Sequence, residues 1–120
     1  MKKIVLAIDD DLLREVYKRG LIKSKFKVFP VQTKKEIFDV LEKEEIDLVL
    51  VDVAIENVRG LDILEEIQEK KKIKIPTIVF SALDDRELKE RAKRLGAKEF
   101  LVSIEVSPDE LVKKIKSFLK

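Results

Sequence analysis

Five apolar segments of strand length alternate with five amphipathic segments of helix length, and this alternation limits the possible folds more than any other feature. The apolar segments span residues 3–8, 26–31, 47–52, 76–81 and 99–103. The helical patterns span residues 11–24, 34–44, 60–70, 85–95 and 108–119. Strict strand–helix alternation is typical of a parallel sheet covered by helices. The pattern therefore predicts an α/β fold with five parallel strands and five helices.

A proline in the second apolar segment predicts the order of the strands. Pro30 has no N–H to donate to a neighbouring strand, so it belongs on an edge strand. Right-handed crossovers with this strand outermost give a doubly wound, flavodoxin-like sheet of order 2-1-3-4-5.

Capping signals agree with the expected helix starts. Thr33 with Glu36 and Ser107 with Glu110 both fit the capping box, in which two residues three positions apart satisfy each other's backbone N–H groups. Pro108 stands at a first helical position, where its missing N–H costs nothing. We therefore expect helices to begin directly after Thr33 and Ser107.

Composition bounds the class of protein. The 120 residues suit one folded domain, residues 1–120, because 45% of them are hydrophobic. The chain contains no cysteine and no histidine, which argues against thiolate zinc sites and imidazole-based catalysis. No apolar run reaches the length of a membrane span, and the apolar run after the basic start is too short for a signal peptide. We expect a cytoplasmic protein with no membrane partner.

The charged residues do not indicate a nucleic-acid partner. The net charge of +2 is the difference between 26 basic and 24 acidic side chains, which are interleaved along the chain. The one dense basic run, residues 70–72 with Lys74, follows an expected helix end, where cations complement the helix dipole. No one-sided basic face of the kind that binds nucleic acid is indicated.

Polar side chains stand at the ends of the expected strands. Asp9 and Asp10 follow the first strand, Asp52 ends the third, and Ser81 and Ser103 end the fourth and fifth. In an open α/β sheet, ligands bind beyond the carboxyl ends of the strands. Three carboxylates converging there repel one another unless a cation binds. Oxygen donors alone favour a hard ion such as Mg²⁺.

Each of these residues also has a purely structural interpretation. Asp10 or Asp11 could cap the first helix. The Ser81 hydroxyl could be satisfied by nearby backbone. The combination of the acidic pair with Asp52 and Ser81, on successive adjacent strands, is what favours a functional site.

Four segments match one known family in order and spacing. They read VLAIDDD, DLVLVDVAI followed by Gly60, PTIVFSA and LGAKEFL. With these segments the whole chain resembles the response regulator receiver domain of two-component signalling, in the CheY-like superfamily. The resemblance implies a CheY-like fold and a signalling role rather than an enzyme, with at most self-phosphorylation and self-dephosphorylation.

The resemblance also implies roles for individual residues. Asp9 and Asp10 correspond to the acidic pair that holds Mg²⁺, and Asp52 to the metal-bound carboxylate that attacks a phosphohistidine. The Ala54 backbone carbonyl would complete the metal site. Two further positions correspond to the switch: Ser81 to the hydroxyl that binds the phosphoryl group, and Phe100 to the aromatic ring that swings inward.

The chain departs from the family where a lysine and a cis proline usually follow the fifth strand. Ser103 and Ile104 stand there, and serine cannot replace the lysine charge that pairs with the phosphoryl oxygens. Ile104 favours a trans peptide bond, so we expect a rebuilt loop. Arg59 or Lys98 could supply the missing charge, and Glu56 replaces a common proline.

Two functions remain open at this point. The first is a stand-alone receiver that accepts a phosphoryl group on Asp52 from a histidine kinase or phosphotransfer protein. It would then present an altered fourth-helix and fifth-strand face to an unknown target, as a monomer or weak dimer. The second is a pseudo-receiver that binds proteins without phosphorylation, which Ser103 and Ile104 favour. A flavin or nucleotide enzyme is disfavoured, because the acidic loop after the first strand repels phosphate.

Overall fold

The computed structural model describes residues 1–55, 60–70 and 75–119, with only the backbone of Lys70. Five strands are present: β1 (Lys3–Ala7), β2 (Lys27–Val31), β3 (Leu48–Asp52), β4 (Thr77–Ser81) and β5 (Glu99–Val102). The helices are α1 (Asp11–Lys23), α2 (Lys34–Lys43), α3 (Gly60–Lys70), α4 (Arg86–Arg94) and α5 (Pro108–Phe118), with a short 3₁₀ helix, η2 (Ser103–Glu105). Every expected strand and helix is present.

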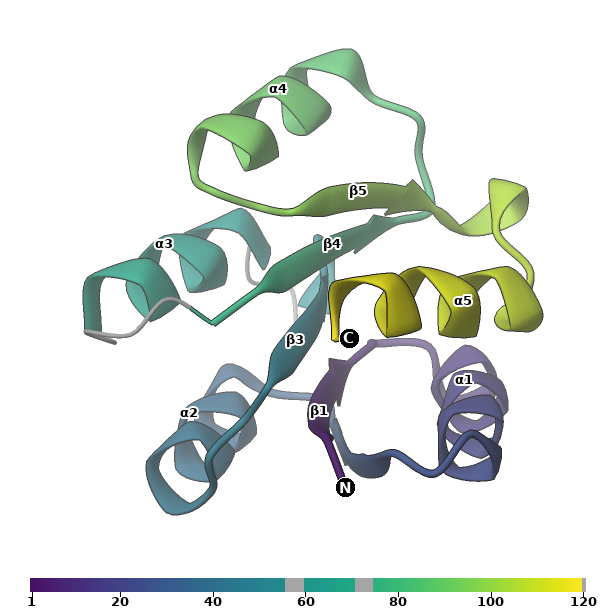
Figure 1. Ribbon diagram of the computed structural model, residues 1–120. Coiled ribbons are helices and arrows are strands. Elements are labelled where there is room, and N and C mark those ends of the chain that lie inside the picture. Colours follow the sequence, from purple (N-terminus) through teal and green to yellow (C-terminus); the bar gives the residue numbers. More distant parts are fainter. Residues whose placement is uncertain (56–59, 71–74, 120) are drawn as a thin grey trace.

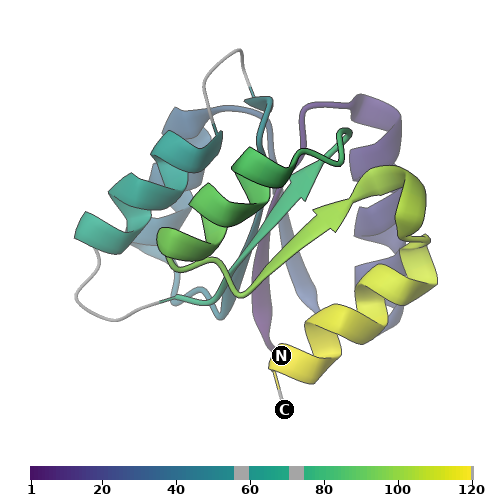
Figure 2. The same cartoon turned by 90° about the horizontal axis from the view of Figure 1, so that it is seen from above.

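The strands form one parallel sheet in the order β2-β1-β3-β4-β5, as Pro30 predicted. Pro30 is exposed on the edge strand β2, where it pairs in register with Leu6 of β1. All five strands run in the same direction, so their carboxyl ends meet at one edge of the sheet (Figure 2). That edge carries the polar residues that the sequence places after the strands.

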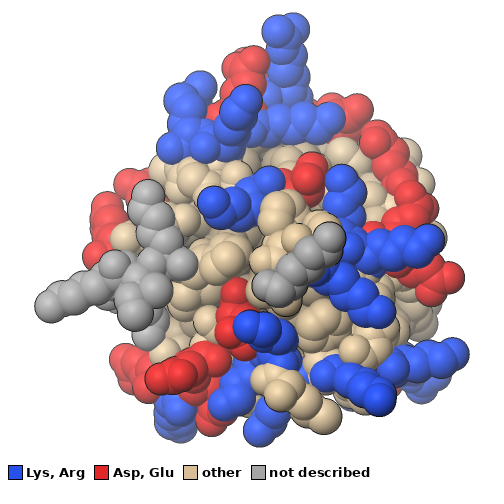
Figure 3. All heavy atoms as spheres, in the orientation of Figure 1, with Lys and Arg blue, Asp and Glu red and all other residues tan. Residues whose placement is uncertain are grey.

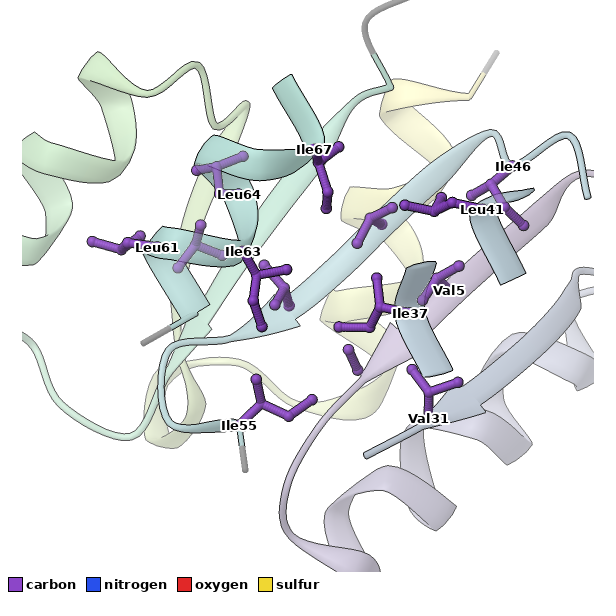
Figure 4. Packing of buried hydrophobic residues seen from close by; sticks show 14 of the residues in the cluster. Val5, Val31, Ile37, Leu41, Ile46, Ile55, Leu61, Ile63, Leu64 and Ile67 are labelled. Atoms are coloured by element: carbon purple, nitrogen blue, oxygen red, sulfur yellow. The ribbon is translucent and has the colours of Figure 1, made fainter. Parts of the chain in front are cut away.

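Helices cover both faces of the sheet (Figures 1 and 2). α2, α3 and α4 lie on one face, over a core that includes Val5, Val49 and Val79. Figure 4 shows the α2 and α3 parts of this core, with Ile37 and Ile63 among the side chains that fill the space between helices and sheet. α1 and α5 cover the opposite face, over a second cluster of buried side chains.

Side chains cap several helices. The Ser107 hydroxyl accepts a hydrogen bond from Glu110 N at 3.1 Å, and the Glu110 carboxylate accepts one from Ser107 N, which confirms that capping box. Thr33 also caps its helix, but the Glu36 carboxylate accepts from Gln32 N rather than from Thr33 N. The second expected capping box is therefore only half formed, because the Glu36 carboxylate binds the amide one residue before Thr33.

No element boundary differs from the expected one by more than a single residue. At the fourth helix, Asp85 is the N-cap and Leu95 the C-cap, so the helix itself spans Arg86–Arg94. The fifth strand ends at Val102 because Ser103 begins η2. Glu56, Arg59 and the basic residues 71, 72 and 74 lie outside the described residues. None of the described helices has the length and apolar character needed to cross a bilayer.

Candidate functional site

A pocket of about 400 Å³ lies at the carboxyl edge of the sheet, between the ends of β1, β3 and β4. We call it the acceptor pocket. Its polar lining includes Asp9, Asp10, Asp52, Ser81 and Ser103, so the structure brings all five strand-end residues to one pocket. The remaining lining is mainly apolar, and comes from Leu13, Val53, Ala54, Phe80, Ala82, Leu83 and Leu88.

Asp52 is held in place by two backbone amides. One carboxylate oxygen, Oδ1, accepts a hydrogen bond from Ala54 N at 3.0 Å. The other, Oδ2, accepts a longer one from Asp9 N at 3.3 Å. Asp52 is the last residue of β3. Its side chain is half-buried, while the other four residues of the strand are fully buried. The carboxylate is therefore fixed by β3 and the β1–α1 loop, while one side of it faces the pocket.

Burial raises the pKa of the Asp52 carboxyl above its usual range. The amide hydrogen bonds from Ala54 and Asp9 lower this pKa again, each by less than burial raises it. The negative charges of Asp9 and Asp10 add to the rise, because they disfavour a third charge nearby. A bound cation would relieve this cost, since it would offset the negative charges around Asp52.

Both residues of the acidic pair after β1 line the pocket, and one of them also caps a helix. Asp10 is the N-cap of α1, and its Oδ1 accepts a hydrogen bond from Leu13 N at 2.8 Å. Asp9 and Asp10 are both exposed and both line the acceptor pocket. The capping interpretation of Asp10 is therefore confirmed, and it leaves the second carboxylate oxygen of Asp10 for other contacts.

The donors at the pocket suit a hard divalent cation by their chemistry, because they are carboxylate and carbonyl oxygens. Within the described residues, however, no three acidic side chains are close enough together to form a metal-binding cluster. A Mg²⁺ site formed by Asp9, Asp10, Asp52 and the Ala54 carbonyl stays a prediction.

We expect Asp10→Asn to raise the melting temperature in EDTA at neutral pH by roughly 2 °C, because like-charge relief is worth a few tenths of a kcal/mol. Asparagine caps helices as well as aspartate does, so the bond to Leu13 N is kept. The pKa of Asp52 is raised in the folded state, so its destabilising charge is present above that pKa and absent at low pH. The gain should therefore disappear on acidification.

Calorimetry of Asp10→Asn and Asp10→Ala, with and without Mg²⁺, measures both effects. Asp10→Ala should be less stable than the native chain by about 1 kcal/mol, because it loses the helix cap. Asp10→Asn should also show less stabilisation by Mg²⁺. A lower melting temperature for Asp10→Asn in EDTA would mean that attraction between the Asp10 charge and the α1 dipole outweighs the repulsion.

Ser81 is buried at the end of β4 and forms a closed local turn. Its hydroxyl donates a hydrogen bond to Leu83 O at 2.9 Å and accepts one from Leu83 N at 3.0 Å. The structural interpretation of this hydroxyl is therefore what the structure shows. A phosphoryl-binding role requires that the hydroxyl leave the Leu83 carbonyl, and this role stays a prediction.

Phe100 lies outside the acceptor pocket. It is half-buried on β5, in register with Val79, and it packs against the core beneath α4. It lines a separate groove between α4 and β5. The inward movement that the family resemblance implies stays a prediction.

The loop after β5 begins with Ser103 and Ile104. Ser103 is half-buried and lines the acceptor pocket, while Ile104 is 88% exposed. Both belong to η2, and the described part of the chain has no cis peptide bond. The expectation of a trans bond before Ile104 is confirmed, and the rebuilt loop stays a prediction.

No lysine or arginine is among the described residues that line the acceptor pocket. Lys98 was a candidate for the missing charge, but this interpretation is wrong. Lys98 N donates to Thr77 O at 2.8 Å, which places it at the amino end of β4 and β5, at the opposite edge of the sheet. Arg59, the other candidate, lies outside the described residues.

Two residues that shape the site were missed as site residues in the sequence. Arg14 Nη1 donates to the Ile8 carbonyl at 2.7 Å, and its Nη2 contacts Asp11 Oδ1 at 2.5 Å, so it ties the β1–α1 loop to α1. Arg14 follows Asp11 by three residues, a spacing that predicts an ion pair on one helix face and could have been read from the sequence. Gly60 lies against the Asp52 backbone, since a Cβ there would be 2.2 Å from the Asp52 carbonyl oxygen.

The family model for the response regulator receiver domain matches residues 4–116. This match covers nearly the whole chain, so the chain belongs to the response regulator receiver domain family of two-component signalling. The sheet order and the acidic pocket at its carboxyl edge agree with that assignment.

Curated proteins and solved structures with similar chains point the same way. The chain is 31% identical over 99 residues to the transcriptional regulatory protein QseB of Escherichia coli O157:H7, covering 82% of this chain and 45% of QseB. It is 27% identical over 100 residues to the probable transcriptional regulatory protein SilR of Salmonella typhimurium, covering 83% and 43%. The chain spans less than half the length of these two relatives.

Similar folds occur in a CheY-like receiver domain protein from Methanospirillum hungatei JF-1 and in a response regulator from Thermotoga maritima. The first has a TM-score of 0.88 and 23% identity, covering 98% of this chain and 92% of the other. The second has a TM-score of 0.87 and 24% identity, covering 98% and 97%. The BeF3-activated DrrB receiver domain has a TM-score of 0.86 and 23% identity, covering 99% of this chain and 97% of the other. At these identities the matches establish the CheY-like, flavodoxin-like fold.

Proposed function

We propose that this receiver domain accepts a phosphoryl group on Asp52 from a histidine kinase or a histidine phosphotransfer protein. The observation that carries the proposal is the fixed, half-buried Asp52 carboxylate, which faces a pocket lined by two more acids. In the reaction, an Asp52 oxygen attacks the phosphorus of a phosphohistidine. The new O–P bond forms as the N–P bond breaks, and the imidazole leaves with the electron pair.

The chain supplies positioning for this step. Amides of Ala54 and Asp9 hold the two Asp52 oxygens and orient the carboxylate for attack. Asp9, Asp10, Asp52 and the Ala54 carbonyl would hold Mg²⁺, which neutralises charge on the phosphoryl oxygens when it is bound. Ser81 would then exchange its bond to the Leu83 carbonyl for one to a phosphoryl oxygen.

Exposed apolar side chains near the acceptor pocket support a protein as the phosphodonor. Leu12 of α1 is 75% exposed, Leu83 after β4 is 67% exposed, and Ile104 of η2 is 88% exposed. They come from three segments that follow the carboxyl ends of strands. Exposed apolar side chains that form one patch rimmed by polar residues are typical of protein interaction surfaces. We expect the domain to act in the cytoplasm as a monomer or weak dimer.

A pseudo-receiver is the second candidate function. Two observations favour it: the described pocket lining lacks a lysine or arginine, and the Ser81 hydroxyl is already satisfied by Leu83. In that case the pocket binds a cation, while protein binding does not depend on phosphorylation.

An NMR titration of the ¹⁵N-labelled chain separates the two functions. Mg²⁺ is added first, followed by beryllofluoride, which mimics a phosphoryl group on aspartate. For a phosphorylated switch we expect Mg²⁺ to shift the amides of Asp9, Asp10 and Asp52, and beryllofluoride to extend the changes to Ser81 and Phe100. Asp52→Asn is the control, because it should abolish the beryllofluoride response.

Each outcome supports one function. Changes that stop at the acidic residues, with no response to beryllofluoride, contradict phosphorylation and support the pseudo-receiver. A beryllofluoride response that survives in Asp52→Asn would show that the mimic binds elsewhere.

A further inference from the structure

The helices α1 and α5 lie side by side on one face of the sheet. A Cβ at Gly20 of α1 would be only 3.5 Å from Val112 Cγ2 of α5. Both helices begin beyond the carboxyl ends of strands and run toward the amino edge of the sheet (Figures 1 and 2). Acidic side chains suit the first turn of a helix and basic ones the last, because of the helix dipole. Charges of one sign therefore gather at the same end of both helices.

Five lysines gather at the amino-edge end of this layer. We call them the basic corner: Lys2, Lys23, Lys25, Lys27 and Lys116. Lys27 N donates to Lys2 O, and Lys25 N donates to Ile22 O, both at 2.9 Å, so the starts of β1 and β2 lie at the end of α1. Lys23 and Lys116 follow one helical turn after the contact of Gly20 with Val112. Figure 3 shows basic side chains gathered at the lower right of the view, where Figure 1 draws α1.

The charges of the basic corner are not offset within the described part of the chain. All five side chains are exposed, and none of them forms an ion pair there. Glu44 attracts Lys27, but its carboxylate already pairs with Lys3 at 3.0 Å. Lys25 has a backbone φ of 68°, in the left-handed region that favours glycine or asparagine. The chain therefore carries a lysine where an uncharged residue would suit the backbone better.

The carboxyl-edge end of the same layer is acidic. We call its exposed carboxylates the acidic end: Asp9, Asp10, Asp11, Glu105, Asp109 and Glu110. Arg14 offsets Asp11, with 2.5 Å between the charged atoms. Lys89 is attracted by Glu105, but it pairs with Asp84. Charges that are interleaved along the sequence are thus separated by the fold into two ends of opposite sign.

Both ends also expose apolar side chains. Ile22 and Met1 are exposed beside Lys23 and Lys2 of the basic corner. Leu12 of α1 and Ile104 of η2 are exposed at the acidic end. Apolar side chains gain free energy when two surfaces meet and exclude water from them. The two ends therefore complement each other in charge, and each offers apolar surface to bury.

We propose that the basic corner of one copy of this chain docks on the acidic end of a second copy. Complementary charges favour this head-to-tail contact over contacts between like ends. The contact uses two different surfaces, so association can continue beyond two copies unless a ring closes. Docked lysines would face the acceptor pocket, whose described lining has no cation. The association requires no phosphotransfer.

A dilution series of the ¹⁵N-labelled chain, from millimolar to micromolar concentration at low salt in EDTA, is the first test. Exposed ion pairs are weak and screened by salt, so self-association should appear only toward the millimolar end. We expect the amides of residues 22–27 and 104–110 to shift together with concentration. The shifts should vanish in concentrated NaCl. Sedimentation velocity should show a sedimentation coefficient that rises over the same range of concentration.

Two double variants test the two ends separately. Lys2→Glu with Lys25→Glu changes the basic corner, and Glu105→Lys with Asp109→Lys changes the acidic end outside the predicted metal ligands. Each should weaken self-association about tenfold, because two exposed ion pairs are lost and replaced by repulsion. A well-dispersed spectrum of each variant shows that it is folded.

Lys93→Glu with Lys98→Glu is the matched control. It makes the same change of net charge as the basic-corner variant, at exposed positions outside both ends, and should leave self-association unchanged.

Three results would overturn the proposal. They are shifts that do not depend on concentration, shifts confined to one of the two ends, and equal weakening by the control variant. A chain that stays monomeric but binds phosphatidylglycerol vesicles through the basic corner would replace the second copy by a membrane surface. No measurement uses a phosphodonor, so a failure of this proposal and a failure of phosphotransfer are distinguishable.

Discussion

Ser103→Lys is expected to strengthen beryllofluoride binding at Asp52 about thirtyfold, because a charge-assisted hydrogen bond to the phosphoryl mimic is worth about 2 kcal/mol. Ser103 lines the same pocket as Asp52, so a lysine there can extend over the acidic residues. No described residue of the pocket lining carries a positive charge at present. The substitution would restore the residue that most receiver domains have at this position.

Ile104→Lys is the matched control for this result. It adds the same charge one residue later, but Ile104 is 88% exposed and does not line the pocket. Titration of both variants with beryllofluoride in Mg²⁺, followed by NMR, gives the two affinities. Equal strengthening in both variants would point to a general charge effect. No strengthening in Ser103→Lys would mean that the trans η2 loop holds the new side chain away from Asp52.

Gly60→Ala is expected to destabilise the fold by about 3 kcal/mol, because the new methyl group overpacks rigid backbone. Its Cβ would lie 2.2 Å from the Asp52 carbonyl oxygen and 2.7 Å from Val53 Cα. Neither atom belongs to a flexible side chain, so the β3 end must move. Gly60 N also donates to Val53 O at 2.9 Å, and this bond would be strained. The movement should displace Asp52 and weaken the response to Mg²⁺.

Gly20→Ala provides the control, because it makes the same chemical change where space is available. A Cβ at Gly20 would lie 3.5 Å from Val112 Cγ2, which is ordinary van der Waals contact. In the interior of α1, alanine should stabilise the chain by roughly 0.5–1 kcal/mol. Urea unfolding of both variants measures the two changes. A loss of less than 1 kcal/mol in Gly60→Ala would show that the β3–α3 connection adapts easily.

Much of the architecture follows from short-range patterns in the sequence. The five strands and five helices come from apolar periodicity, and Pro30 places β2 at the edge because it lacks an N–H. The helix boundaries differ at capping residues, such as Asp85, whose backbone is still extended before α4. The fifth strand ends one residue early because Ser103 begins η2.

The site was only partly predictable. Parallel strands end at one edge, so the grouping of Asp9, Asp52 and Ser81 in one pocket could be expected from strand order alone. Helix capping by Asp10 could not be separated from the predicted metal binding in the sequence, because an aspartate at that place suits both roles. Lys98 directly precedes β5, so the direction of the strand already argues against it as the missing charge, because the acidic residues lie at the carboxyl ends.

The sequence by itself determined the fold class, the strand order and the edge at which the acidic residues meet. These features depend on hydrophobic periodicity and on the parallel direction of the strands, and both can be inferred from the order of residues along the chain. The tertiary structure alone decided how Ser81 closes on Leu83, how Asp52 is held by two amides, and how closely Gly60 approaches it. A change of a few tenths of an ångström in position would make or break these contacts, and the packing of the whole domain sets those positions.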